Sequence, residues 1–355
     1  MERSTAFYIN GGAGRVISSI PAFINYEKDN PDDDFIIVCE GGMDFYKGHP
    51  TLHKRAFDNW HKNLYEEKIK NRNCISPEPY RVWEYYNQKC SIAQAFDIEI
   101  NKKGIRDLED PTIHLFKPEI AQAYNAVEEV KSVTGFDKVI VVQPFGRAVE
   151  NSGDLIIDGT SRSFNLNDLI EIVNILKKEY AVIMMSEFPI SLEKETNNKF
   201  PVAQPNIPDI RIWAGIIEIA DHFLGCDSVG QHIVKALGGT ATVVLGATYP
   251  VNVSFPNNDN FDIIDLGENK RTYSPIRLTM EDMPDRLNDE VMMMSDDDKK
   301  LIINTVKKRL GKSEKYTGTY TPPQQTQEVC PTHGVVHNQQ AQPAQILGHT
   351  GKPNI

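Results

Sequence analysis

A glycine-rich turn between an apolar strand and a helical apolar pattern most constrains the fold of this sequence. The segment "TAFYI" (residues 5–9) has the composition of a buried strand, and Gly11, Gly12 and Gly14 follow it. A second apolar segment, "DFIIVCEGG" (residues 34–42), again ends in glycines. Between the two, apolar residues recur at the spacing of one helical face: Val16, Ile17, Ile20, Phe23 and Ile24. The order strand, helix, strand predicts a parallel sheet with crossover helices.

The same alternation starts again in the second half of the sequence. "DKVIVVQPFG" (residues 137–146) has the β-branched run of a strand and ends in Pro and Gly. A helical pattern follows, with Asn165 as its expected cap, and further apolar strands then alternate with helices. A chain of 355 residues exceeds one ordinary domain. We therefore predict an α/β protein with two cores, one in residues 1–135 and one in residues 136–290.

The last part of the sequence changes character. "SDDDKKLIINTVKKRLGK" predicts a helix with Ser295 as its cap, acids in its first turn, bases in its last turn and Gly311 as its end. We assign residues 291–312 to this C-terminal helix. Residues 313–355 are rich in Gln, Pro, Thr and Gly, and they have too few apolar side chains to offset the entropy of ordering. A disordered, low-complexity tail is expected there.

Composition narrows the function classes. Hydrophobic residues make up 40% and charged residues 25%, which is typical of a globular protein. The net charge of −11 argues against broad attraction to nucleic acid or to an anionic membrane, although a local basic cleft could still bind phosphate. No apolar run approaches the ~20 residues of a membrane span, and the first residues lack the pattern of a signal peptide, so the cytoplasm is the expected compartment.

The cysteines indicate neither disulfides nor a metal site. All five are far apart in the sequence and none forms a C-x-x-C pair, so free thiols are expected. Cys330 and the scattered histidines of the tail match no tetrahedral spacing. We therefore predict no metal.

The first glycine turn, "NGGAGR", has the form of an anion-binding turn. Glycines before a helix let the backbone approach an anion, and the free N–H groups of the helix amino terminus favour negative charge. Arg15 supplies either a fixed positive charge or a solvent-facing side chain of the first helical turn. A tight turn that only permits packing is the alternative interpretation of Gly11, Gly12 and Gly14.

The second glycine turn, "FLGCDSVGQHIVKALGG", follows a short strand in the second half. Asp227, Ser228, Gln231 and His232 cluster just before or within the first turn of the next helix. This is the carboxyl end of a strand, where open α/β sheets bind their ligands. Helix capping by Asp227 and Ser228 is the alternative interpretation.

Taken together, these segments resemble the heptosyltransferase-like glycosyltransferases of family 9. "GGAGRVISSIPAF" is similar to their "GGxGDxxxxxPAL" start, and "ADHFLGCDSVGQHIVKALGGTATVVLGATYP" is similar to their most specific element, "ADLFVGNDSGxxHLAAALGxPTVxLFGxTxP". "QPFG…SRSFNLNDLIEIVNILKKEYAVIMMS" resembles their strand, basic step, helix and strand. The matches run in order over about residues 5–40 and 137–256. The resemblance implies a GT-B fold, in which two Rossmann-like domains face each other across a cleft.

The resemblance also implies a nucleotide diphosphate-sugar donor, held mainly by the second domain, and no cofactor. Asp227, Ser228 and His232 fall on the family's Asp-Ser-Gly…His positions, and Arg162 falls on its basic residue near the donor phosphates. A guanidinium and a helix amino terminus can both stabilise charge on a departing nucleoside diphosphate. Glu187 is expected near the donor's ribose or base. The predicted donor site comprises Arg162, Glu187, Asp227, Ser228, Gln231 and His232.

Arg15 departs from the family pattern. It stands where the family has an aspartate taken to be the general base, and a guanidinium effectively cannot accept a proton. Either another residue is the base or the chemistry has been lost. Asp44 and His49 follow the second strand and could serve, as could His53, although an ordinary surface position is the alternative for each. Residues 229–230 also depart, because Val precedes Gly where the family has glycine first.

The leading prediction is therefore a glycosyltransferase that moves a sugar, a heptose by the family's name, from a nucleotide diphosphate donor to an acceptor, with inversion. Asp44, His49 and Arg15 are the candidate catalytic residues. The acceptor could be a glycan, a protein or a modified base in nucleic acid. A catalytically degenerate binding or structural protein on the same scaffold is the alternative, and a nucleotide-dependent epimerase, which would release free sugar, is a third hypothesis.

Overall fold

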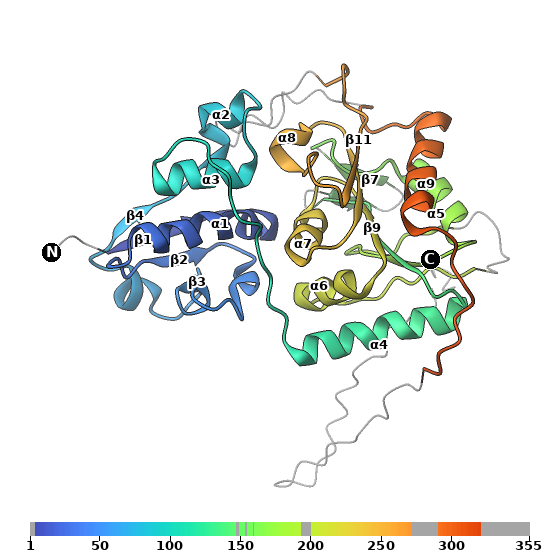
Figure 1. Cartoon of the computed structure of the whole chain (residues 1–355), viewed down its shortest axis with the longest axis horizontal. Coiled ribbons are helices and arrows are strands. Elements are labelled where there is room, and N and C mark those ends of the chain that lie inside the picture. The colour runs from blue at the N-terminus through green and yellow to red at the C-terminus, as the bar shows by residue number, and fades with distance from the viewer. Residues whose placement is uncertain are drawn as a thin grey trace, which may run out of the picture.

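The chain folds into two α/β domains that lie side by side (Figure 1). The computed structural model describes residues 4–146, 149–152, 155–158, 160–192, 200–271 and 290–320. Within these ranges, none of the helices is both long enough and apolar enough to span a membrane.

The first domain is built on a four-stranded parallel sheet. Its strands, in the spatial order β3-β2-β1-β4, are β1 (Thr5–Ile9), β2 (Ile36–Cys39), β3 (Ala56–Asp58) and β4 (Asn73–Ile75). From β1 the chain passes through the glycine turn into α1 (Ala13–Asp29), whose apolar face is buried against the sheet. The other helical segments are η1 (Met43–Tyr46), η2 (Leu52–Lys54), η3 (Tyr65–Ile69), η4 (Pro79–Arg81), α2 (Trp83–Tyr86) and α3 (Ile92–Asn101).

The second domain carries a five-stranded parallel sheet. Its strands, in the spatial order β11-β10-β9-β5-β8, are β5 (Val139–Gln143), β8 (Ala181–Met184), β9 (His222–Gly225), β10 (Ala241–Leu245) and β11 (Phe261–Asp265). All but β11 are buried along their whole length, as expected of a parallel sheet covered on both faces. Its helices are α5 (Leu166–Leu176), α6 (Ile210–Ile219), α7 (Val229–Leu237), α8 (Pro250–Val253) and α9 (Asp296–Leu310). An antiparallel hairpin follows β5 and consists of β6 (Val149–Ser152) and β7 (Leu155–Asp158).

The strand order creates a switch point in each sheet. In the first domain, β1 lies between β2 and β4; in the second, β5 lies between β8 and β9. Where neighbouring parallel strands lead to opposite sides of a sheet, their carboxyl ends leave a crevice that binds ligands. The loops after β1 and β4, and those after β5 and β9, are therefore the places where a site is expected.

The local predictions around the glycine turns are confirmed. The predicted strands correspond to β1, β2, β5, β8, β9 and β10. Asn165 caps α5 through its side-chain oxygen, which accepts the N–H of Asn167 at 3.0 Å. Ser295 caps α9, and Gly311 follows the last turn of that helix. The α/β class with two sheets is therefore correct.

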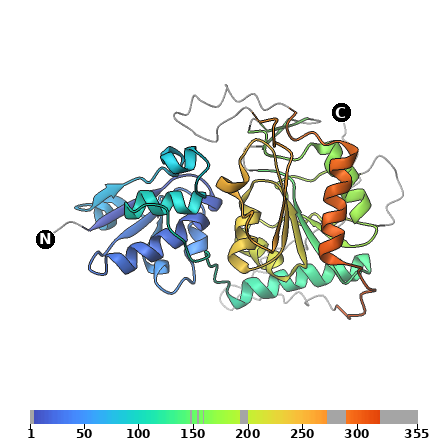
Figure 2. The ribbon, with the colours of Figure 1, turned by 45° about the horizontal axis from the view of Figure 1, so that its top comes forward.

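Helix α4 (Lys117–Thr134), which the predicted boundary places in the first domain, packs against the second. It lies along α6 and also contacts β8, and Figure 2 shows it running beneath the second domain. Gly215 of α6 permits this approach, because a Cβ there would lie 2.8 Å from the Cβ of Ala123. This packing favours a division before α4 instead of at residue 135.

The predicted tail is too long at its start. Phe136 and Lys315 form an antiparallel bridge, and the side chain of Asp137 accepts hydrogen bonds from Ser313 and from the N–H of Glu314, at 2.8 and 2.7 Å. Backbone pairing and one carboxylate thus order a segment whose composition predicted disorder. Residues 321–355, including Cys330, lie outside the described residues.

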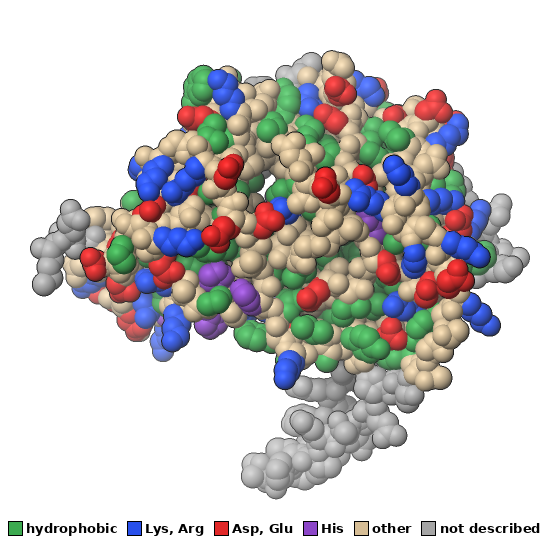
Figure 3. Space-filling model, in the orientation of Figure 1, with side chains coloured by type: hydrophobic (Ala, Val, Ile, Leu, Met, Phe, Trp, Pro, Cys, Tyr) green, Lys and Arg blue, Asp and Glu red, His purple; other side chains and the backbone are tan. Residues whose placement is uncertain are grey.

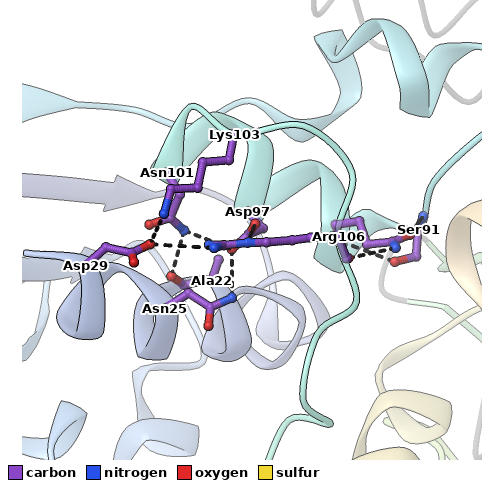
Figure 4. Close-up of polar contacts among 9 residues, drawn as sticks. Ala22, Asn25, Asp29, Ser91, Asp97, Asn101, Lys103 and Arg106 are labelled. Carbon is purple, nitrogen blue, oxygen red and sulfur yellow. Dashed lines mark hydrogen bonds and ion pairs between the residues drawn. The ribbon is translucent and has the colours of Figure 1, made fainter.

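A buried carboxylate joins α3 to α1. Figure 4 shows Asp97 of α3, which is 1% exposed, accepting hydrogen bonds from Asn25 of α1 and from Arg106. The guanidinium of Arg106 binds both carboxylate oxygens, at 2.6 and 2.8 Å. Because buried charges are tolerated when they are paired and hydrogen-bonded, this network fixes α3 beside the last turns of α1.

Candidate functional site

In the second domain, Gln143 at the end of β5 organises the switch point. Its side chain is almost fully buried and bridges to the turn after β9: Nε2 donates to Ser228 Oγ at 3.1 Å, and Oε1 accepts the N–H of Gly230 at 2.8 Å. A Cβ at Gly230 would lie 2.4 Å from that Oε1 and 2.3 Å from the ring of Phe223. Close backbone approach therefore occurs at Gly230, one place after the family's glycine.

Ser228 begins α7 without capping it. The residue is the N-cap of the helix, but its hydroxyl bonds to Gln143 and accepts no N–H from the first turn. The capping interpretation of this side chain is therefore wrong. Because α7 also has no acidic residue in its first turn, the positive end of its dipole is not neutralised within the helix at the switch point.

Asp227 and Arg162 form an ion pair beside this helix end. Asp227 Oδ2 lies 3.7 Å from Arg162 Nη1, and Asp227 Oδ1 accepts from Gln231 Nε2 at 3.1 Å. The backbone N–H of Arg162 donates to Asp158 Oδ2 at 3.2 Å, and its Nε donates to Thr160 Oγ1 at 3.0 Å. Burial would lower the pKa of Arg162, but Asp227 and Asp158 outweigh it and raise the pKa. The site thus presents a fixed positive charge whose side chain is 27% exposed.

His232 lies where the two domains touch. It is buried in α7, and a Cβ at Gly14 of α1 would lie 3.1 Å from its Cδ2. Gly14 therefore permits α1 to approach α7. Burial lowers the pKa of His232 to about 4, against the opposing effect of Asp227. The imidazole is neutral at pH 7.

We expect the protein to lose stability between pH 6.5 and pH 4 because of two buried histidines. His222 bonds to two threonine hydroxyls, and burial lowers its pKa to about 4, as for His232. In the unfolded chain both titrate near 6.5, so the unfolded state binds more protons across this window and is favoured as pH falls. Each histidine lowers the free energy of unfolding by about 3 kcal/mol across this window. Urea unfolding at pH 7 and pH 4.5 measures the loss, and His232→Gln should remove about half of it.

The glycine turn after β1 already binds a carboxylate of the protein. Gly11 has a φ of +87°, and its N–H donates to Glu40 Oε2 at 2.5 Å. Gly12 is the N-cap of α1. Gly42 brings the turn after β2 against α1, since a Cβ there would lie 2.5 Å from Ala13 Cα. This geometry favours the packing interpretation of the turn at Gly11.

Arg15 is buried within the first domain, so the solvent-facing alternative for its side chain is wrong. Only 11% of the side chain is exposed, and Nη1 donates to Glu78 Oε1 at 3.2 Å. The guanidinium carbon lies 4.8 Å from the ring centre of Tyr80 and 5.3 Å from that of Phe96. Nε and Nη2 are buried and find no hydrogen-bond partner among the residues that the structure describes. Arg15 is thus an interior cation held by a carboxylate and two aromatic rings.

The two switch points meet across the domain junction. Asn252 of α8 donates to the carbonyl oxygens of Tyr85 and Cys90, at 3.0 and 2.9 Å. Burial raises the pKa of Tyr85 well above its usual value, and the charge of Asp227 in the other domain adds to this. In the space-filling view, the surface is hollowed between the two domains (Figure 3). A cleft at this junction agrees with the predicted fold class.

Asp44 and His49 lie at another interdomain contact, around Arg211 of α6. Arg211 Nη1 donates to the carbonyl of Asp44 at 2.8 Å, while the carboxylate of Asp44 pairs with Lys47 at 2.5 Å. His49 is buried, its Nδ1 accepts backbone N–H groups at the start of η2, and its ring centre lies 5.6 Å from that of His114. Figure 3 shows histidines gathered where the domains meet. A role as general base stays a prediction for both residues.

Glu187 is exposed in the segment after β8. The neighbouring Phe188 stacks on Phe145 of the loop after β5, with ring centres 5.4 Å apart. Contact between Glu187 and a donor stays a prediction. In the described part of the chain, no three His, Cys, Asp or Glu side chains gather to hold a metal ion.

Sequence reasoning missed Gln143, Glu78 and Tyr80. Gln143 is a polar residue that ends an otherwise apolar strand, which was a usable signal. Glu78 and Tyr80 lie in the segment without family resemblance, and only the tertiary fold brings them to Arg15.

Solved structures share this architecture. The chain is similar to a family 9 glycosyl transferase from Veillonella parvula DSM 2008, with a TM-score of 0.60 and 12% identity, over 87% of this chain and 98% of that one. It is similar to the ADP-heptose LPS heptosyltransferase II of E. coli, with a TM-score of 0.53 and 10% identity, over 86% and 100% of the two chains. It is also similar to TibC, an iron-containing dodecameric glycosyltransferase from enterotoxigenic E. coli H10407, with a TM-score of 0.52 and 10% identity, over 86% and 79%.

Two α/β domains with facing switch points, similar to these structures, define a protein of the GT-B fold class. Within that class, the chain has the heptosyltransferase-like fold of the family 9 glycosyltransferases. No protein-family model and no curated protein sequence matches it.

Proposed function

We propose that this protein is a glycosyltransferase that takes a sugar from a nucleoside diphosphate donor bound in the second domain. The observation that carries the proposal is that Arg162, paired with Asp227, lies at the switch point of the second sheet beside the start of α7, which the Ser228 side chain does not cap. A fixed guanidinium and a helix amino terminus are both suited to a diphosphate. Their position at the carboxyl ends of β5 and β9 is where nucleotides bind in such sheets.

Neighbouring residues have different roles in the proposed donor site. Arg162 binds the diphosphate and stabilises the charge that develops as the sugar leaves. Asp227 orients Arg162, and Gln143 fixes the turn that carries Ser228. His232, neutral at pH 7, lies between this turn and α1, so it faces the acceptor side of the cleft.

An ADP-linked heptose is the first donor to test. The E. coli heptosyltransferase II named above is an ADP-heptose enzyme, and TibC has been solved in complex with ADP-D-beta-D-heptose. We infer transfer with inversion to an acceptor bound by the first domain. A glycan, a protein and a modified base are the acceptor classes to compare.

Titration calorimetry with ADP, UDP and GDP, followed by assays of nucleoside diphosphate release from the matching sugars, tests the proposal. We expect saturable binding of one nucleoside diphosphate, and release from its sugar donor when acceptor is added. Binding without release across the acceptor panel would favour the catalytically degenerate alternative. Absence of binding to all three nucleotides would contradict both.

A further inference from the structure

We propose that Glu78 is the general base of the transfer, a role that rests on the proposed function. The topology places it at the right edge of the first domain. Arg15 follows β1, and Glu78 follows β4, the strand beside β1 in the sheet. Because the carboxyl ends of adjacent parallel strands meet, Glu78 reaches the switch point that faces the second domain.

Only one of the two carboxylate oxygens of Glu78 accepts hydrogen bonds from the described part of the protein. Oε1 accepts from Arg15 Nη1 at 3.2 Å and from the N–H of Tyr80 at 3.4 Å. Oε2 accepts no hydrogen bond from any residue within the described ranges. The side chain is 26% exposed, so a ligand can reach it. One oxygen is therefore positioned while the other is free to accept a proton.

Arg15 is a positioning residue in this arrangement. Tyr80 and Phe96 hold its guanidinium, and Phe96 lies on α3 beside Asp97, whose buried network fixes α3 to α1 (Figure 4). The resemblance places the acidic residue of this turn at position 15 itself. Here a carboxylate from the segment after the neighbouring strand lies against the residue at position 15.

The other carboxylates near the two switch points are engaged differently. Glu40 accepts the N–H of Gly11 at 2.5 Å in the glycine turn. Asp227 is 6% exposed and shared between Arg162 and Gln231. Glu78 differs from both in that its fixed oxygen is held by Arg15, the residue that stands at the position of the family's acid.

The proposed step balances without a further reactant. The acceptor hydroxyl oxygen forms a bond to the anomeric carbon of the donor sugar, and its proton moves to Glu78. The bond between that carbon and the diphosphate oxygen breaks, and its electron pair leaves on the nucleoside diphosphate beside Arg162. Glu78 then returns the proton to water.

Glu78→Gln tests this assignment, because it keeps the side chain's size and its hydrogen bond to Arg15. With ADP-heptose and a panel of acceptor sugars, we expect kcat to fall by about 100-fold or more, as for loss of a general base. Donor affinity, measured by calorimetry, should stay within about threefold of the wild type, as expected for a group that acts in the transition state. Glu78→Asp should retain partial activity, and Glu84→Gln, in the same segment, should behave as the wild type.

Three results would separate the possibilities. If wild-type protein turns over and Glu78→Gln matches it, this inference fails and the proposed function stands. If Glu40→Gln abolishes transfer while Glu78→Gln does not, the base is Glu40 and the inference is again overturned. If wild-type protein releases no nucleoside diphosphate with any acceptor, the proposed function fails, and the inference with it.

The pH profile separates catalysis from structure. A general base gives kcat/KM an acidic limb that reports its titration in the free enzyme. We expect this limb to be lost in Glu78→Gln. A variant that only weakened the fold would keep the limb and lower the whole profile, and that result would also overturn the assignment.

Discussion

Arg211→Ala is expected to lower the free energy of unfolding by about 3–5 kcal/mol, as removal of one partner from a buried ion pair does. Arg211 is 1% exposed, and its Nε and Nη2 donate to the two carboxylate oxygens of Glu119, at 2.5 and 2.8 Å. It also donates to the carbonyl oxygens of Asp44 and His114 in the first domain, at 2.8 and 2.6 Å. Alanine would leave the carboxylate of Glu119 without its cation and two carbonyl oxygens without this donor. Urea unfolding measures the loss.

A surface arginine provides the matched control. Arg309 of α9 also binds a carboxylate, that of Asp262, but both side chains are about one-third exposed. Exposed pairs of this kind contribute about 0–1 kcal/mol, so Arg309→Ala should be nearly neutral. Equal losses of unfolding free energy in the two variants would contradict the larger contribution expected from the buried Arg211.

The double variant Arg211→Met/Glu119→Gln tests the mechanism of that loss. Burial would raise the pKa of Glu119, but hydrogen bonds from Arg211 and from the backbone outweigh it and hold the pKa low. Without Arg211, the carboxylate of Glu119, whose side chain is only 15% exposed, loses its cation, whereas the double variant leaves no uncompensated charge. It should therefore recover part of the stability lost in Arg211→Ala.

The sequence was sufficient where the determinants are local. The strands and helices around both glycine turns follow from apolar periodicity and capping residues within short segments. Asp227, Ser228, Gln231 and His232 could be grouped because one turn of chain carries them all. Gln143 joins that group from 85 residues away, so its role becomes evident only when β5 and β9 are paired.

Contacts between distant segments were not predictable from periodicity. Arg15 and Glu78 are 63 residues apart, and Arg211 and the carbonyl of Asp44 are 167 residues apart. A charged residue in the first turn of a helix is normally exposed, so nothing in the local pattern marked Arg15 as buried. The packing of α4 and the pairing of residues 313–316 depend likewise on partners far along the chain.

Arg162→Ala is expected to weaken nucleoside diphosphate binding by about 30-fold or more, since loss of a charged partner at a desolvated site costs about 2 kcal/mol or more. Turnover should fall further, by about 100-fold or more, because the same guanidinium would stabilise charge that grows as the sugar departs. Calorimetry with the nucleoside diphosphate measures the first effect, and single-turnover release measures the second. Arg162→Lys keeps the charge but loses the planar fork that Thr160 orients, so it should recover binding only in part.

Arg55→Ala is the control that distinguishes a donor site from a general loss of positive charge. Arg55 pairs with Glu27 in the first domain, and its side chain is 23% exposed, against 27% for Arg162. It should leave nucleotide affinity unchanged. If Arg162→Ala also binds the nucleotide as wild type does, the diphosphate lies elsewhere, because removal of a charge that contacts it should weaken binding. If Arg162→Ala abolishes binding while Arg55→Ala does not, the nucleotide site is assigned to the β5–β9 switch point, and the acceptor must then approach from the side of Arg15 and Glu78.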